Sequence, residues 1–165
     1  MTSQYTDATR QHTIAAGQHI DVSRQHADAV PANTLAGVTV VYVLNGTGIH
    51  TLEDFWREIG DAVNGPGGYF GTNLDAFADC LRGGHGTPDG GDFTLEWRDH
   101  QISRHSLGYP ETIRQLEQRL ARAHPSNKPA VDAELADARA HRGPTVFDWL
   151  VDIINTEAPG ALLLR

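Results

Sequence analysis

Two aspartates four residues apart are the side chains whose types and spacing most suggest chemistry in this sequence. Asp75 and Asp79 would share one face of a short helix, because residues at positions i and i+4 are neighbours on a helix surface. Asn73 can cap the start of that helix, and Gly83 and Gly84 can end it. The helix dipole disfavours a carboxylate near the C-terminal end, where Asp79 lies. The position of Asp79 therefore indicates a role other than helix stability.

The acidic pair has two interpretations. Leu74, Phe77 and Leu81 would form an apolar stripe on a different face, so the aspartates can be the solvated side of an ordinary amphipathic helix. Alternatively, two carboxylates held on one rigid helix can bind the cationic groups of another molecule. The residues alone favour the first interpretation.

Motifs of common enzyme classes are missing. The sequence has no phosphate-binding P-loop, no dinucleotide fingerprint and no Gly-x-Ser-x-Gly elbow. Cys80 and His85 could be a nucleophile and a base, but a lone cysteine beside a core leucine is more typical of a small buried residue. The histidines at 85, 100 and 105 lack a zinc-binding spacing. We therefore expect no enzymatic activity, no catalytic residue, no metal and no cofactor.

Composition and charge narrow the class of partner. The 165 residues suffice for one domain with a core, and the formal net charge is −8. This charge disfavours direct binding to nucleic acid and favours a basic protein partner, although many proteins are acidic for solubility alone. No apolar run is long enough to span a membrane. The single cysteine and the lack of a secretory signal pattern predict a cytoplasmic protein.

Hydrophobic periodicity predicts strands that alternate with helices, which is typical of an α/β fold around a parallel sheet. The run 38–44 is almost continuously apolar and predicts a strand buried on both faces. Thr51 with Asp54, and Thr145 with Asp148, are capping signatures at helix starts. Further strands are expected at 93–97 and 161–164, and helices at 52–63, 74–82, 99–107, 110–123, 131–141 and 146–157.

The stretch Tyr69–Gly84 resembles the barstar family, the intracellular inhibitors of small secreted ribonucleases. The resemblance is carried by Tyr-Phe-Gly-Thr-Asn-Leu-Asp at 69–75, by Asp-Cys-Leu at 79–81 and by Leu-Glu-Trp-Arg at 95–98. It implies an α/β fold in which three parallel strands are packed with helices. From the order of the elements, we expect the first strand in the middle of the sheet.

The resemblance also implies a function, namely inhibition of a small basic ribonuclease. Carboxylates on the acidic helix would imitate substrate phosphates and enter an active site lined by cations. Asp75, Asp79 and Tyr69 match the family's inhibitory positions, and ungapped matching from the C-terminus adds Asp152. The expected partner-binding residues are Tyr69, Asn73, Asp75, Asp79, Gly83, Gly84 and Asp152. The protein is expected to be a monomer when free.

Departures from the family pattern leave other functions open. Gly84 stands where an aromatic residue flanks the inhibitory helix in the family, and Arg82 adds a positive charge beside it. An immunity or regulatory protein that binds a target other than a ribonuclease is the main alternative. A small enzyme or ligand-binding protein with the same fold is a weaker one, since fold alone does not fix function.

Three segments are expected along the chain. Residues 1–36 are polar, with Gln-His pairs seven residues apart, and predict a weakly structured tail. Residues 37–165 would form the barstar-like domain. Within it, 108–143 has no counterpart in the family and predicts an inserted helical hairpin, which we expect to lie away from the acidic helix.

Overall fold

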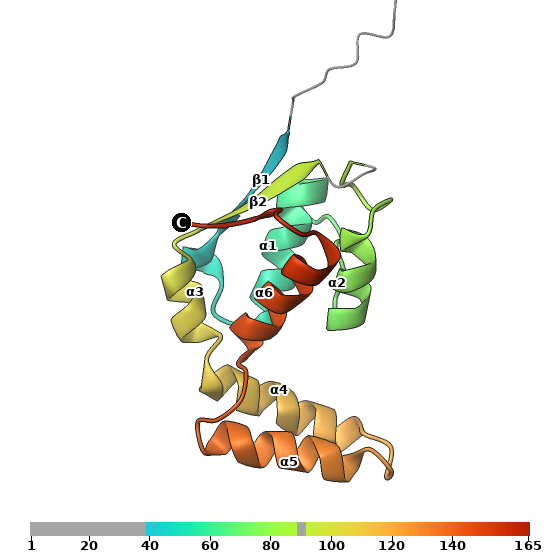
Figure 1. Ribbon diagram of the computed structural model, residues 1–165, viewed down its shortest axis with the longest axis vertical. Helices are drawn as coiled ribbons and strands as arrows, with labels where there is room; N and C mark the ends of the chain where they lie inside the picture. Colours follow the sequence, from blue (N-terminus) through green and yellow to red (C-terminus); the bar gives the residue numbers. More distant parts are fainter. Residues whose placement is uncertain (1–38, 89–91) are drawn as a thin grey trace, which may run out of the picture. The chain divides into compact units, whose positions relative to one another are not determined.

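The computed structural model describes residues 39–88 and 92–165, so the expectations for residues 1–36 lie outside the described part. In this part, three strands and six α-helices alternate as an α/β fold (Figure 1). The strands are β1 (Val40–Asn45), β2 (Phe93–Arg98) and β3 (Leu162–Leu164). The helices are α1 (Leu52–Asn64), α2 (Leu74–Leu81), α3 (His100–Ser106), α4 (Tyr109–Arg122), α5 (Lys128–Arg139) and α6 (Val146–Glu157), and a 3₁₀ turn, η1, covers Gly46–Gly48.

The sheet is parallel throughout and has the order β1-β2-β3. The expectation that the first strand lies in the middle was wrong, because β2 pairs with both neighbours. Its inward residues Phe93, Leu95 and Trp97 are buried, as a central strand requires.

The two edge strands are more exposed than their apolar sequences predict. Val41 in β1 is 51% exposed and Leu163 in β3 is 37% exposed. Helices α1 and α6 pack against these strands from the same side of the sheet (Figure 1), so side chains on the other side stay in solvent. The prediction that the run 38–44 is buried on both faces was therefore wrong, because helices cover only one face of the sheet.

A cluster of aromatic rings joins the helices to the sheet. The ring centroids of Phe55 and Phe77 are 5.3 Å apart, those of Phe55 and Trp97 are 5.2 Å apart, and those of Trp97 and Phe147 are 5.1 Å apart. These contacts connect α1, α2, β2 and α6 through fully buried side chains. The position of α2 is therefore fixed by the core.

Helix α3 follows the prediction except at one position. The sequence predicts that Ile102 and Leu107 face inward. Leu107 is buried, but Ile102 is 44% exposed and does not face inward. The inward position belongs to Ser103, whose hydroxyl accepts a hydrogen bond from Trp97 Nε1 and donates one to the carbonyl of Gly46. A polar residue thus occupies the core side of this short helix because two buried polar groups need it.

Helices α4 and α5 pack on each other through a second apolar cluster formed by Leu116, Val131, Leu135 and Ala138. The partly buried side chain of Trp149 in α6 packs against both this cluster and the main core. Helix α5 begins at Lys128, earlier than predicted, because proline is tolerated in the first turn of a helix.

Candidate protein-binding surface

Helix α2 begins and ends as its sequence predicts. Asn73 Oδ1 accepts a hydrogen bond from the backbone N–H of Ala76, at 2.9 Å. Gly71 adopts φ +88°, and a Cβ atom there would come within 2.7 Å of the Phe77 nitrogen, so the turn into the helix requires glycine. Gly83 and Gly84 also adopt positive φ beyond its C-terminal end.

The loops before and after α2 are held together by a side chain that the sequence analysis did not single out. Asn64 Nδ2 donates to the carbonyl oxygen of Tyr69 at 2.8 Å and to that of His85 at 2.9 Å. The hydroxyl of Tyr42 donates to the Gly86 carbonyl at 2.8 Å. An asparagine at the end of α1 gives no sequence signal for this role, because its two acceptors lie in distant loops.

The acidic face of α2 is exposed, and its apolar face is buried. Asp75 and Asp79 are both exposed, whereas Phe77 and Leu81 are buried and Leu74 is half-buried. The Asp79 side chain is 68% exposed. Within the described residues, no cation forms an ion pair with Asp75. The expected orientation of the helix is therefore confirmed.

Asp79 has one cationic neighbour on its own helix. Arg82 Nη1 lies 2.6 Å from Asp79 Oδ1, and the same guanidinium donates to both carboxylate oxygens of Glu157 in α6, at 2.8 Å each. Hydrogen bonds from Arg82 to Glu157, and then its attraction to Asp79, raise the pKa of Arg82 above its usual range. The sequence gives no signal for the contact of Arg82 with Glu157, because the two residues lie far apart in the chain.

The other expected partner-binding residues occupy two places. Tyr69 is 54% exposed and precedes α2 in the same loop that carries Gly71. Asp152 is exposed on α6, the helix that packs against α2. The structure thus places Tyr69, Asn73, Asp75, Asp79, Gly83 and Gly84 in one loop–helix–loop segment and Asp152 on its neighbour.

Cys80 and the histidines show no arrangement typical of catalysis or metal binding in the described part of the chain. Burial, and then the nearby Asp79 carboxylate, raise the pKa of the Cys80 thiol, which favours its protonated form. Across residues 39–88 and 92–165, no group of three or more His, Cys, Asp or Glu side chains could hold a metal ion. No helix found there is long and apolar enough to cross a membrane.

A cavity of about 550 Å³ separates α2 from the helical hairpin. Its walls include Asn73 and Asp75 on one side and Arg119 and Arg122 of α4 on the other, with Trp149 of α6 between them. The hairpin therefore approaches α2 at its N-terminal end, near Asn73 and Asp75, and does not reach Asp79. Neither Arg114 nor Arg119 contacts Asp79. Arg114 pairs with Glu53 and Glu111, and Arg119 pairs with Glu134.

A buried carboxylate explains where the hairpin lies. Glu111 of α4 accepts a hydrogen bond from the Leu52 N–H at the start of α1, at 2.9 Å, and pairs with Arg114. The Thr112 hydroxyl accepts another from the Val146 N–H at the start of α6. These contacts hold α4 against the starts of α1 and α6, beside the N-terminal end of α2.

The three-stranded parallel sheet and the exposed acidic helix define a small α/β protein with two carboxylates presented to solvent on one helix. A sequence model of the family described as Barstar (barnase inhibitor) matches residues 39–132. The chain belongs to the barstar family. No match was found among curated proteins. The family match ends within α5, so α6 with Asp152 lies outside it. Membership supports a ribonuclease-inhibitor-like role at the level of the family.

Proposed function

We propose that this protein inhibits a small basic ribonuclease by covering its active site with α2. The observation that carries the proposal is the orientation of the helix, with Asp75 and Asp79 in solvent and Phe77 and Leu81 in the core. Both carboxylates are thereby presented from a rigid element. Little conformational entropy remains to be lost when they bind.

The mechanism is electrostatic and steric. A ribonuclease active site holds the phosphates of RNA with cationic side chains, and two carboxylates on one helix can take the place of those phosphates. Asp79, at the C-terminal end of α2, and Asp75, in its first turn, are the groups that would do so. The exposed ring of Tyr69 adds contact area at the start of the helix. No covalent step and no cofactor are needed.

The flanking residues support this assignment. Asn73 holds the first turn of α2, and Gly83 and Gly84 add no side chains of their own beyond its C-terminal end. Asp152 on α6 would extend the acidic surface sideways. The formal net charge of −8 would draw a basic partner toward this surface and speed association. The inhibitor would act as a monomer in the cytoplasm, in keeping with its single cysteine.

The experiment is an inhibition screen with the full chain. Purified small basic ribonucleases, barnase among them, are assayed for RNA cleavage with and without the protein. We expect stoichiometric inhibition of at least one enzyme by the wild type, and strongly reduced inhibition by the Asp75→Ala/Asp79→Ala double variant. The control is Asp132→Ala/Asp137→Ala, which removes two exposed carboxylates from α5. Equal inhibition by both double variants would contradict the proposal.

A second candidate is an immunity or regulatory protein whose target is not a ribonuclease. Arg82 beside Asp79, and glycine at 84, favour it, because both make this surface a poorer match for the cationic site that the family binds. Failure of every ribonuclease in the screen, with capture of a different purified toxin that depends on Asp75 and Asp79, would support this candidate.

A further inference from the structure

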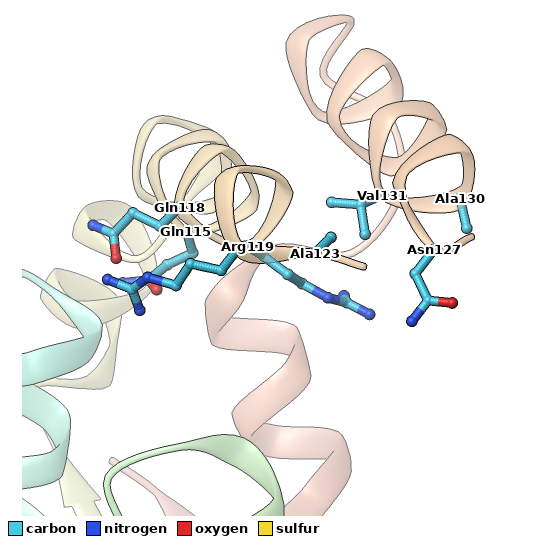
Figure 2. A pocket seen from close by; sticks show the side chains of 8 residues that line it. Gln115, Gln118, Arg119, Ala123, Asn127, Ala130 and Val131 are labelled. Carbon is cyan, nitrogen blue, oxygen red and sulfur yellow. The ribbon is translucent and has the colours of Figure 1, made fainter. Parts of the chain in front are cut away.

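The basic end of α4 faces the same cavity as the acidic helix, and no role in the proposed inhibition accounts for it. Arg119 and Arg122 line the wall opposite Asn73 and Asp75. A groove of about 570 Å³ between α4 and α5 is lined by the same two arginines. Figure 2 shows Arg119 among the side chains that line this groove. These arginines therefore form a ridge on α4 with a hollow on either side.

Both arginines can engage another molecule. Arg122 pairs with no carboxylate in the described part of the chain. Arg119 pairs with Glu134 at 3.1 Å, and the two side chains are 61% and 48% exposed. An exposed ion pair of this kind contributes little free energy, so exchanging Glu134 for an intermolecular carboxylate costs little.

A stable interface is larger than the exposed face of α2. A specific complex buries about 800 Å² on each partner, contributed by roughly 20 to 30 residues. Helix α2 has eight residues and presents only one face of them. A partner that covers Asp75 must therefore extend over neighbouring elements, and the α4 wall of the cavity is directly adjacent.

On this basis we infer that the α4 ridge is a second binding region for the ribonuclease, occupied by a loop that carries an aspartate or glutamate. This inference rests on the proposed function and specifies the partner further. The enzyme should have a cationic active site over α2 and an acidic loop at its rim, which enters the cavity between α2 and α4. Opposite charges on the two walls would fix the orientation of the complex and exclude ribonucleases whose rim is basic.

The test is charge reversal at matched positions of the hairpin. The probe is the ribonuclease that the inhibition screen selects. Arg119→Glu breaks one exposed α4–α5 ion pair on the cavity side. Arg139→Glu breaks a second α4–α5 ion pair, which Arg139 forms with Glu117 away from the cavity. The side chains of Arg139 and Glu117 are 57% and 52% exposed. Both changes alter the net charge by the same amount. Arg122→Glu removes the second arginine of the ridge, and thermal unfolding of each variant checks that it is folded.

If the ridge contacts the enzyme, charge reversal there should weaken inhibition, whereas the added negative charge alone would strengthen binding to a basic enzyme. We expect Arg119→Glu and Arg122→Glu each to raise the inhibition constant at least about tenfold at low salt, and less at high salt, because reversal places like charges together. Arg139→Glu should change it less than about twofold. If all three variants inhibit equally well, or bind the basic enzyme more tightly because they are more acidic, the ridge does not contact the enzyme.

Failure of this inference can be told apart from failure of the proposed function. If Asp79→Ala abolishes inhibition while the ridge variants inhibit like the wild type, the acidic helix binds the enzyme and the ridge does not. If Asp79→Ala has no effect, the proposed function itself is wrong. A ridge variant that alters self-association in sedimentation, with inhibition unchanged, would assign the cavity to a second copy of this chain and overturn the inference.

Discussion

Arg82 donates two hydrogen bonds to the carboxylate of Glu157 and thereby joins the end of α2 to the end of α6. The same guanidinium also lies 2.6 Å from Asp79, the residue that we expect to contribute most to inhibition. The guanidinium of Arg82 thus stabilises the position of α2 and competes with the partner for the carboxylate of Asp79. Stability and affinity should respond to it in opposite directions.

Replacing Arg82 by alanine should strengthen inhibition while slightly weakening the fold. Asp79 would no longer have to leave an intramolecular cation. An exposed pair of this type contributes little free energy, so the inhibition constant should fall by at most roughly fivefold. Thermal unfolding should show only a small loss of stability. The control is Arg57→Ala, which breaks the exposed pair with Asp54 in α1. Weaker inhibition by Arg82→Ala would show that Arg82 itself contacts the partner.

Glu111→Gln should make stability less dependent on pH in the acid range. Burial alone would raise the pKa of Glu111, but hydrogen bonds from Arg114, Gln115 and the Leu52 N–H outweigh it and lower the pKa. A carboxylate whose folded pKa is lowered stabilises the protein above its unfolded pKa, near 4.3 in model peptides, and this stabilisation is lost as pH falls through the folded value.

The expected loss for Glu111→Gln at neutral pH is about 1–3 kcal/mol, because Arg114 loses its partly buried partner. The difference from the wild type should shrink as the pH falls below the unfolded pKa of a glutamate and through the lower folded pKa of Glu111. Urea unfolding at several pH values measures both. Glu117→Gln, at an exposed position on the same helix, is the control. A constant difference across the pH range would show that the charge of Glu111 is not the cause.

Substitutions at two glycines with similar positive φ can distinguish backbone strain from steric conflict at the start of α2. Gly71 has φ +88° and Gly65 has φ +80°, but only at Gly71 would a Cβ meet backbone atoms, at 2.7 and 2.8 Å. Gly65→Ala should cost about 1–3 kcal/mol from its backbone conformation alone, since φ +80° with ψ 174° is essentially restricted to glycine. Gly71→Ala should cost clearly more and should also weaken inhibition, because the turn or α2 must move. Equal losses in urea unfolding would contradict this account.

Local patterns were sufficient to predict the elements, because their causes are local. Thr51 with Asp54, and Thr145 with Asp148, form the capping boxes expected from their spacing. Asn73 caps α2 as predicted. The exposure of Asp75 and Asp79 followed from helical periodicity, in which apolar residues on one face leave the other face to solvent.

Relations between distant residues could not be predicted in this way. The strand order is set by contacts between segments that lie far apart in the chain. The valine-rich sequence of β1 would suit an edge strand as well as a central strand. The contact between Glu111 and Leu52 joins residues far apart in the chain, yet it holds α4 against the start of α1. Arg82 and Glu157 are an equally distant pair. Buried polar anchors of this kind leave no periodic pattern in the sequence.

Asp79→Ala should weaken inhibition more than any other single substitution, with Asp75→Ala next. Docking removes water from the cations of the enzyme's active site, and deleting the carboxylate leaves them buried and unpaired. The expected loss of binding free energy is about 2–5 kcal/mol, which is the general range for buried charge pairs and includes complexes of this family. Most of the loss should appear as faster dissociation. Inhibition constants and dissociation rates, measured at two salt concentrations, test this.

The same substitution should hardly affect the free protein. Asp79 is 68% exposed and its pair with Arg82 is a surface pair, so losing it costs at most a few tenths of a kcal/mol. Alanine is the better helix former, and removing a carboxylate from the C-terminal end relieves its conflict with the helix dipole. We expect the free energy of unfolding to stay within about 0.5 kcal/mol of the wild type. If Asp79→Ala unfolds the protein, or inhibits as well as the wild type, Asp79 is a structural residue and α2 is not the inhibitory element.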